Sequence, residues 1–582
     1  MSTHTTVIIG GVAGGMSAAT RLRRLDEERT IIVLERGNEV SFANCGLPYH
    51  LGGVIPERSD LVLQRPASLT ARFALDVRVR SEVTAIDPDN RTVTVHDLSN
   101  DSAYSLRYDS LVLSPGASAN GILIPGGNRA HTLRDLSDLD RIMAELSPLA
   151  RRGGDEKPAA VVIGGGYIGL EVAENLHTAG LAVTIVQRGP QLLSTFDPEM
   201  AHPVAEHLVH TGIPVLLNSA VAEITPTAVL LSDGRALSAE LVIAATGVTP
   251  ETELAAAAGL RIGTSGAIWV DEYQHTSAPH IYAIGDAAEK TLAATATPGV
   301  VPLAGLANHH GRLVADAIAG IPAPAPRALG TAIVAINGLV AASTGASERM
   351  LRALGRPVRV IHTHPSNHVG YYPGGEAMSV KLLVDPATDL LLGAQIVGGV
   401  GVDKRIDVLA TALAAGLTAS ALADLELAYA PQFGAAKDPI NMIGYINRNQ
   451  ARGQDDTVQW HQLAGELAAG ATLLDVRPAP ARAEGTIPGA LHIPLDELRT
   501  RAAEVPTGRL VVHCRVGHSA HNAQRLLAQR GHSVVNLDGG YLTWRAGTAG
   551  THPAAVAATT PARPAQSTAS ASASASAQEI SI

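Results

Sequence analysis

Two glycine-rich turns, each between an apolar strand and a helix, constrain the fold of this chain most. The first, "GGVAGG", follows the apolar stretch Thr6–Ile9, and a second apolar stretch, Thr30–Leu34, ends at Glu35. The same order recurs over Ala159–Gln187, around "GGGYIG". Strand, glycine turn, helix and strand form a βαβ unit, in which the N–H groups at the start of the helix bind a pyrophosphate. We therefore predict an α/β protein with two Rossmann-like domains that bring two nucleotides face to face.

The two turns differ in features that select the nucleotide. The first keeps the outer glycines of G-x-G-x-x-G, Gly10 and Gly15, but has Val12 at the middle position, and Glu35 stands where an acid binds ribose hydroxyls. The second turn matches in full, but its following strand ends in Gln187–Arg188 rather than in an acid. Arg188 is either a solvated charge or a partner for a 2′-phosphate, so the choice between NADH and NADPH stays open.

Composition excludes several classes of function. A chain of 582 residues is too long for one core, and its net charge of −10 argues against a nucleic-acid partner. Two cysteines cannot form a disulfide framework, which fits a reducing cytosol. The start "MSTHTTVIIGG" does not resemble a signal peptide, and no apolar run is long enough to span a bilayer. We expect a cytoplasmic protein with a small-molecule substrate and without a metal, nucleic-acid or membrane partner.

The chain after the second βαβ unit changes pattern three times. Strands followed by the helical stretch "DVLATALAAGLTAS" predict an α+β domain, and "NRNQARGQDD" reads as a polar linker. Short strands then alternate with helical stretches, as expected for a small α/β domain. The final segment is rich in alanine, serine, threonine and proline ("STASASASASA") and is expected to be disordered.

These motifs, in their order, resemble the flavin-dependent pyridine nucleotide–disulfide oxidoreductases over residues 1 to about 448. Two further segments carry the resemblance, because "IYAIGDAAE" and "AATGVTP" match segments that contact FAD and the nicotinamide nucleotide in that family. The resemblance implies that FAD is bound by Gly10, Val12, Ala13, Gly14, Gly15, Glu35, Arg36, Ser114, Gly116, Gly285, Asp286 and Pro302. It implies that NADH or NADPH is bound by Gly164, Gly166, Tyr167, Ile168, Gly169, Glu171, Gln187, Arg188 and Gly247.

Most members of this family carry C-x₄-C, but here His50 takes the place of the second cysteine after Cys45. The stretch "SFANCGLPY" resembles the single-cysteine branch, most closely the coenzyme A-disulfide reductases. In that branch the protein cysteine forms a mixed disulfide with coenzyme A, so the resemblance implies that Cys45 pairs with its substrate. Such exchange needs a thiolate. Taken alone, Cys45 would equally well be an inert buried thiol.

The resemblance extends to the rest of the site. Tyr371 and Tyr429 match tyrosines that act across a subunit interface, where a phenol donates a proton to a leaving thiolate, and this implies a homodimer. The motif "APQFGAAKD" departs from the usual "APPYSSAKD" at Gln432 and Phe433, which alters the expected shape of the coenzyme A pocket. Matched coenzyme A contacts are Ser17, Arg21, Arg24, Ser41, Asn44, Arg72, Asn308 and Lys437, although without the family the arginines would be solvated helix charges.

Tyr167 and Glu171 match residues at the nicotinamide face of the flavin. The match implies that Tyr167 covers this face when no nicotinamide is bound. For Glu171 an alternative is a purely helical role, since acids near a helix start complement its dipole.

The stretch "VVHCRVGHSA" resembles the six-residue active-site loop of a rhodanese domain. Loop N–H groups and the following helix are expected to stabilise a thiolate or persulfide at Cys514, with Arg515, Gly517 and Ser519 in the same loop. Fusions of this build resemble the NADH-dependent persulfide reductases. The expected domains are FAD-binding (1–115 and 248–326), NAD(P)-binding (116–247), dimerisation (327–448), linker (449–457), rhodanese (458–548) and disordered tail (549–582).

The sequence therefore predicts an FAD-dependent enzyme that uses NAD(P)H to reduce CoA disulfide, CoA persulfide or polysulfide, through a Cys45–CoA mixed disulfide. Cys514 is expected to handle sulfane sulfur, and whether it passes sulfur directly to Cys45 stays open. One alternative is an NADH oxidase or peroxidase in which Cys45 becomes a sulfenic acid, although such enzymes typically read "SFLSCG". The other is a redox sensor whose rhodanese domain only docks a partner.

Overall fold

The computed structural model describes residues 4–152 and 156–549. It divides into a first unit, Met1–Arg188 with Ser219–Gly330, and a second unit, Gly189–Asn218 with Thr331–Ile582. The tail expected to be disordered lies, from residue 550 onward, outside the described residues. Within the described parts of the chain, no helix combines the length and the apolar character that a membrane span requires.

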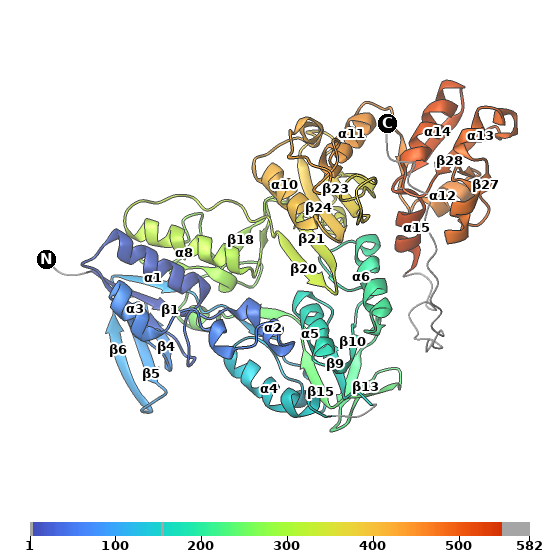
Figure 1. The fold of residues 1–582 in the computed structure, drawn as a ribbon. Coiled ribbons are helices and arrows are strands. Elements are labelled where there is room, and N and C mark those ends of the chain that lie inside the picture. Colours follow the sequence, from blue (N-terminus) through green and yellow to red (C-terminus); the bar gives the residue numbers. More distant parts are fainter. Residues whose placement is uncertain (1–3, 153–155, 550–582) are drawn as a thin grey trace. The chain divides into compact units, whose positions relative to one another are not determined.

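The first unit is built around a parallel sheet in the order β17-β7-β1-β2-β3. Its strands β17, β7, β1 and β2 are mainly apolar, and their successive side chains point to opposite faces of the sheet. Ile8 packs under helices α1 and α8, whereas Val7 and Ile9 pack toward an antiparallel sheet, β4-β5-β6. Figure 1 shows α1 and α8 side by side along this part of the chain. The elements are β1 (Thr5–Ile9), α1 (Ala13–Leu25), β2 (Thr30–Leu34), β3 (Asp76–Arg78), β4 (Ser81–Asp87), β5 (Thr92–Asp97), β6 (Ser102–Arg107), β7 (Ser110–Leu113), β17 (Ile281–Ala283) and α8 (Ala304–Ile318).

A second βαβ unit lies in the same part of the molecule. Strands β10, β9 and β15 are adjacent and parallel, and helix α5 connects β9 to β10. An antiparallel sheet, β12-β13-β14, comes after β10 in the chain, and β8, which precedes β9, pairs with β16. The elements are β8 (Ala117–Ala119), α4 (Leu136–Ala150), β9 (Ala159–Ile163), α5 (Tyr167–Thr178), β10 (Ala182–Val186), β12 (Val221–Ile224), β13 (Ala228–Leu231), β14 (Ala236–Ser238), β15 (Leu241–Ala244) and β16 (Val248–Pro250).

The second unit holds an antiparallel sheet in the order β20-β21-β24-β23-β22. Apolar side chains of β22, β23 and β24 pack against helices α10 and α11, which cover one face of the sheet. Figure 1 labels α10 and α11 near β23 and β24. The elements are α6 (Pro198–His210), β20 (Ala332–Ile336), β21 (Leu339–Gly345), α9 (Glu348–Ala353), β22 (Arg359–Thr363), β23 (Ser379–Val384), β24 (Leu391–Gly398), α10 (Val402–Ala414) and α11 (Pro439–Ala451).

A small α/β domain completes the second unit. Its five strands are parallel in the order β25-β29-β28-β26-β27, and an apolar cluster packs on each face. Helix α11 runs to Ala451 and β25 begins at Thr457, so only residues 452–456 lie between the two elements. The elements are β25 (Thr457–Val458), α12 (Leu463–Ala468), β26 (Thr472–Asp475), β27 (Leu491–His492), α13 (Leu495–Leu498), β28 (Arg509–His513), α14 (His518–Gln529), β29 (Ser533–Leu537) and α15 (Gly540–Ala549).

Candidate functional site

The first glycine turn forms a cradle for a pyrophosphate. Gly10 has φ +98°, and a Cβ there would lie 2.0 Å from the Ser114 carbonyl oxygen. A Cβ on Gly15 would lie 1.9 Å from the Gly10 carbonyl oxygen, so both positions demand glycine. Val12 has a negative φ of −109°, so this position does not adopt the left-handed conformation that favours glycine. Val12 provides no side-chain cap and the first turn of α1 carries no acid, so its N–H groups suit an anion.

Glu35 ties the first glycine turn to the end of β2. Its carboxylate accepts hydrogen bonds from the N–H groups of Gly11 and Gly37, both at 2.8 Å. The neighbouring Arg36 is held by Glu251 through two hydrogen bonds of 2.5 and 3.0 Å. The hydrogen bond to Glu251 raises the pKa of Arg36. Arg36 is therefore not a free cation.

The second glycine turn repeats this geometry with an amide in place of the carboxylate. Gln187 Oε1 accepts from the N–H of Gly165 at 3.0 Å, as Glu35 does from Gly11. Gly164 has φ +112°, and a Cβ on Gly169 would lie 2.0 Å from the Gly164 carbonyl oxygen. Gln187 thus keeps the structural hydrogen bond while removing a negative charge from the position that faces a ribose in this kind of turn.

The remaining expected ligands of the second turn also lie in the first unit. Gly166 precedes α5, which begins at Tyr167, and Ile168 is exposed. Gly247 has φ +105° and lies between β15 and β16. Arg188 is the last residue of the first segment of this unit.

The FAD-type residues expected downstream are also held by specific contacts. Asp286 lies in the short helix Gly285–Ala287 and pairs with Arg134 at 2.7 Å. Gly116, with φ +82°, also lies beside the Arg134 guanidinium. Buried Lys290 donates to the carbonyl oxygens of Gly285 and Ala288, both at 2.5 Å, and burial lowers its pKa to about 8. Sequence reasoning missed Arg134 and Lys290, because neither belongs to a motif. Pro302, the last of the expected FAD residues, is exposed.

Cys45 lies in a short helical turn, Asn44–Gly46, and its thiol is free. The side chain is exposed, yet the protein packed around it raises the pKa of the thiol, and the charge of Glu171 raises it further. Arg134 acts in the opposite direction and Asp286 adds to the rise. The structure thus brings the cysteine loop, the Asp286 turn and helix α5 together within the first unit.

A hydrogen bond joins the cysteine segment to α5. The Tyr49 hydroxyl donates to Glu171 Oε1 at 3.2 Å. Burial raises the pKa of Glu171, and burial together with Glu171 raises that of Tyr49 to about 12. Sequence reasoning named Glu171 but missed Tyr49, although Tyr49 stands only four residues after Cys45.

Several expected substrate contacts meet between α1 and α8. The Ser17 hydroxyl donates to the carbonyl oxygen of Asn308 at 2.8 Å, which places these two residues together. Arg21 pairs with Asp316 at 2.7 Å, so part of its charge is already used. Arg24 is exposed and lies over the Phe73 ring, next to α3 (Pro66–Phe73), the helix that carries Arg72.

Ser41 joins this set through the first glycine turn. Its N–H donates to the carbonyl oxygen of Gly11 at 2.8 Å, and Ser41 itself has φ +50°. Asn44, three residues on, accepts from the Cys45 N–H at 3.1 Å. Both residues are therefore placed by the same loop that carries the thiol.

The two expected tyrosines form a hydrogen-bonded pair in the second unit. The hydroxyls of Tyr371 and Tyr429 lie 3.0 Å apart, and the side chains are 73% and 47% exposed. Buried Arg405 joins the two loops that carry them, because it donates to Asn367 O and Asp438 Oδ2, both at 2.8 Å. Sequence reasoning missed Arg405, since "VDKRIDVL" reads as an ordinary amphipathic helix. On the loop that carries Tyr429, the side chains of Gln432, Phe433 and Lys437 are exposed.

Cys514 follows β28 directly and is buried. The N–H of Gly517, which has φ +93°, donates to Cys514 Sγ at 3.1 Å. Burial raises the pKa of Cys514, while the N–H groups of Ala520, Val516, Gly517 and Ser519 lower it. The expected stabilisation of a thiolate by the loop is present, but burial outweighs it. Arg515, expected to add positive charge, is paired with Glu484 at 2.8 Å.

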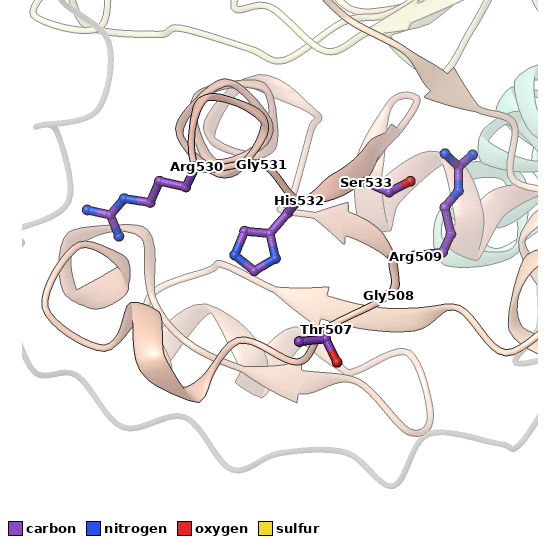
Figure 2. Close-up of a pocket in the computed structure, with 7 residues that line it drawn as sticks. All are labelled: Thr507, Gly508, Arg509, Arg530, Gly531, His532 and Ser533. Atoms are coloured by element: carbon purple, nitrogen blue, oxygen red, sulfur yellow. The ribbon is translucent and has the colours of Figure 1, made fainter.

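A hollow in this domain lies far from Cys514. Figure 2 shows its lining residues, which are Thr507, Gly508, Arg509, Arg530, Gly531, His532 and Ser533. Arg509 begins β28 and Cys514 follows its end, so the hollow and the thiol lie at opposite ends of one strand. The carboxylates of Asp197, Glu199 and Glu348 also cluster, but Lys381 Nζ lies within 3.0 Å of all three. An ammonium group therefore occupies the place that a metal ion would take.

Comparisons with known proteins agree with this geometry. The profile of the pyridine nucleotide-disulphide oxidoreductases matches residues 4–311, that of their dimerisation domain residues 331–438, and that of the rhodanese-like domain residues 459–547. The coenzyme A disulfide reductase of Staphylococcus aureus is 34% identical over 440 residues, which cover 75% of this chain and 98% of the relative.

Two solved structures resemble nearly the whole chain. Reduced CoADR-RHD from Bacillus anthracis matches with a TM-score of 0.91 at 42% identity, covering 94% of this chain and 99% of that one. A NAD-dependent persulfide reductase from A. fulgidus matches with a TM-score of 0.86 at 35% identity, covering 93% and 100%. The family implies FAD and NAD(P)H, which the two glycine cradles fit. The predicted fold class, family and enzyme class are thus confirmed: the chain belongs to the pyridine nucleotide-disulphide oxidoreductases and carries their dimerisation domain and a rhodanese-like domain.

Proposed function

We propose that this enzyme uses NAD(P)H and FAD to reduce CoA disulfide, CoA persulfide or polysulfide at Cys45, while Cys514 handles sulfane sulfur. One observation carries the proposal: Cys45 is a free, exposed thiol with His50 where a dithiol would need its second cysteine. A lone thiol cannot cycle as an internal dithiol, so its disulfide partner has to be a substrate. The similar proteins are named for the reduction of coenzyme A disulfide and of persulfide, which supports coenzyme A and sulfane sulfur as the substrate chemistry.

When bound, FAD supplies a path for two electrons from NAD(P)H to a sulfur atom. In the proposed cycle Cys45 starts as a mixed disulfide with CoA, and two electrons break that bond into a Cys45 thiolate and CoA thiol. The Cys45 thiolate then attacks an incoming CoA disulfide, which restores the mixed disulfide and releases a second CoA thiol. One NAD(P)H and one proton thus convert one CoA disulfide into two CoA thiols.

The same cycle accepts a persulfide. The Cys45 thiolate attacks the CoA sulfur of CoA persulfide, forms the mixed disulfide and releases sulfide. One NAD(P)H and one proton then yield one CoA thiol and one hydrogen sulfide. Cys514 fits the handling of sulfane sulfur, because the loop N–H groups around it point at the sulfur that would carry the persulfide.

The electrostatics of Cys45 disfavour a thiolate in the resting enzyme. Surrounding protein and the Glu171 charge raise the pKa of the thiol, whereas a mixed disulfide carries no charge at this sulfur. The hydrogen-bonded hydroxyls of Tyr371 and Tyr429 are exposed proton donors for a leaving thiolate. We propose that they serve the site of a second copy of the chain, in a homodimer formed through the dimerisation domain.

The ligand assignments made from the motifs are part of this proposal. FAD is assigned to the first glycine cradle and the Asp286 turn, and NAD(P)H to the second cradle. CoA is assigned to the α1–α8 contact residues, the Ser41–Asn44 loop and Lys437. The exposed Phe433 and Gln432 stand beside Lys437 on the same loop, so they are the residues most able to alter the CoA pocket.

The test is anaerobic oxidation of NADH and of NADPH with CoA disulfide, CoA persulfide or polysulfide as acceptor. Wild type, Cys45→Ser, Cys514→Ser and the double variant run side by side. We expect Cys45→Ser to abolish turnover of every acceptor, and Cys514→Ser to affect sulfane sulfur acceptors selectively. If no sulfur acceptor is turned over and oxygen starts NADH consumption, Cys45 is an oxidase or peroxidase cysteine instead.

A further inference from the structure

A row of buried polar side chains crosses the antiparallel sheet of the second unit. His362 on β22 is opposite Lys381 on β23, and Lys381 is opposite Gln395 on β24. Their exposed fractions are 3%, 0% and 1%. Burying such groups is costly unless partners meet them. The partners come from α6, from α9 and from the rhodanese-like domain.

Carboxylates dominate this buried cluster. Lys381 Nζ lies 2.5 Å from Glu199, 2.6 Å from Glu348 and 3.0 Å from Asp197. Arg352 adds a second cation beside Glu348 at 2.6 Å. The cluster therefore holds more negative than positive charge before His362 and Asp538 are considered.

His362 lies between two of these carboxylates. Its Nδ1 is 2.7 Å from Asp538 Oδ2, and its Nε2 is 3.0 Å from Glu199 Oε1. A neutral imidazole has only one N–H, so one carboxylate oxygen would then face a lone pair. When both carboxylates are ionised, only the imidazolium satisfies both contacts. Burial alone lowers the pKa of His362, but the hydrogen bonds to Asp538 and Glu199 raise it to about 9.

The other groups around His362 do not reverse the rise in its pKa. Lys381 opposes its protonation, and the pKa of Asp538 is raised overall, because burial outweighs the lowering by His362. Asp538 Oδ2 also accepts from the backbone N–H of His362 at 2.9 Å and from Gln459 Nε2 at 3.1 Å, and these two donors favour the ionised carboxylate. Burial lowers the pKa of His364 to about 3, so His364 stays neutral. The more distant charged groups are Asp197, Glu348, Arg352, Asp455 and Arg515.

Asp538 begins the turn on which the Cys514 loop rests. The turn continues through Gly539 and Gly540, with φ +66° and +62°, into α15. A Cβ on Gly539 would lie 2.7 Å from His362 Cβ, and a Cβ on Gly540 would lie 2.7 Å from the Cys514 carbonyl oxygen. The glycine turn is thus packed between His362 on one side and the sulfur loop on the other.

Backbone hydrogen bonds complete the connection. The N–H groups of Tyr541 and Leu542 donate to the carbonyl oxygens of Cys514 and Arg515, at 2.9 and 3.0 Å. These donors follow Asp538 by three and four residues, so their positions depend on where Asp538 is held. Moving Asp538 would therefore move the carbonyls that shape the Cys514 loop.

We propose that His362 is a positioning residue of the sulfur-transfer loop: as an imidazolium it fixes Asp538, and through the glycine turn it fixes the loop of Cys514. Loss of its proton in alkaline solution removes the positive charge that strengthens the hydrogen bond to Asp538, which loosens the turn and lowers the sulfur-transfer activity of Cys514. The inference rests on the proposed role of Cys514 and assigns that role a pH-dependent control.

The test uses the fact that the chain has only two cysteines. In a Cys45→Ser background, Cys514 is the sole thiol, so both sulfur transfer from thiosulfate to cyanide and alkylation by iodoacetamide report on it alone. The variants are His362→Ala, His362→Asn and Asp538→Asn, with the double variant His362→Asn/Asp538→Asn. Asparagine at position 362 keeps a neutral donor near Nδ1, and His532→Asn, in the remote hollow of Figure 2, is the matched control.

We expect His362→Ala to lower kcat for sulfur transfer roughly tenfold at pH 7, as for loss of a hydrogen bond to a charged group, with a smaller change in KM. His362→Asn should restore part of this loss. The ratio of wild-type to His362→Asn activity should fall between pH 7 and pH 10, because only the wild type has the His362 imidazolium that loses its proton in this range. The losses in the double variant should not add.

The proposal is overturned if His362→Ala keeps wild-type kcat, or if the ratio of wild type to His362→Asn stays constant from pH 7 to pH 10. If neither the Cys45→Ser background nor any variant transfers sulfur at any pH, the proposed role of Cys514 fails. The alkylation rate of Cys514 then tests by itself whether His362 positions the loop. If the alkylation rate of Cys514 and its pH profile are the same in all variants, His362 does not position the Cys514 loop. Thermal melting identifies a variant that does not fold, and the remaining substitutions then decide.

Discussion

Replacement of Lys381 by methionine tests the buried charge cluster most directly. Methionine has nearly the length of lysine, so the substitution removes the ammonium group with little loss of packing. The ammonium lies within 3.0 Å of the carboxylates of Glu199, Glu348 and Asp197. Without it, three buried carboxylates face one another and only Arg352 and His362 offset their charge. Removing one partner from a buried ionic group typically costs about 3–5 kcal/mol.

The pH dependence separates charge from packing. Lys381 lowers the pKa of Glu199 and of Glu348 below the ordinary value, against the opposing effect of burial. In the wild type these carboxylates contribute stability that is present above the unfolded pKa and is lost as pH falls through the folded pKa. In Lys381→Met the carboxylates repel, so their folded pKa values rise and protonation relieves the strain. The loss should therefore be largest at pH 7 and shrink toward pH 5.

Urea unfolding followed by tryptophan fluorescence measures this loss. Two of the three tryptophans, Trp460 and Trp544, lie in the second unit, so a Trp269→Phe background makes the signal specific for that unit. Lys404→Met is the matched control, because Lys404 is partly exposed and lies 3.8 Å from Asp438, and it should cost no more than about 1 kcal/mol. A loss below about 1 kcal/mol for Lys381→Met at pH 7, or an equal loss at pH 5, would show that the carboxylates are not charged.

Three further predictions concern the nucleotide and thiol sites. Glu171→Gln should lower the pKa of Cys45 and speed its alkylation in a Cys514→Ser background at pH 7, since a nearby negative charge is removed; an unchanged rate contradicts the assigned electrostatics. Gly15→Ala should abolish flavin retention, read from visible absorbance, because its Cβ would lie 1.9 Å from a carbonyl oxygen; a yellow, folded variant refutes this. Gln187→Glu should shift the ratio of kcat/KM toward NADH, because a carboxylate would still accept from Gly165 and would also bind a ribose hydroxyl.

Local patterns were sufficient for the parts of the molecule that depend on neighbouring residues. The strands Thr5–Ile9 and Thr30–Leu34, the two glycine turns and the Cys514 loop all lie where the sequence places them. Glycine at positions 10 and 15 is required by backbone geometry within one turn, so its spacing carries the information by itself. At Val12 the φ of −109° is negative, so the left-handed conformation that favours glycine is not required there.

Contacts between distant segments left no local pattern in the sequence. Arg134 and Asp286 are 152 residues apart, and Tyr49 and Glu171 are 122 residues apart. Asp286 and Glu171 stand in recognisable motifs, but nothing in their own segments marks Arg134 and Tyr49 as the partners. Only folding brings the members of each pair within hydrogen-bonding distance, so no pattern in either segment predicts the pair.

The sequence by itself determined the family, the two nucleotide cradles and the two thiols, because each depends on residue type at short spacing along the chain. Only the tertiary structure decided the surroundings of those thiols. In "RVIHT" and "SVKLLV", His362 and Lys381 alternate with apolar residues, as solvent-facing residues of a half-buried strand do. The structure covers that face with α6 and the rhodanese-like domain, and burial places His362 and Lys381 in a cluster that holds the Cys514 loop. Coulomb energy depends on distance in space and on exclusion of water, and neither quantity is written in the order of residues.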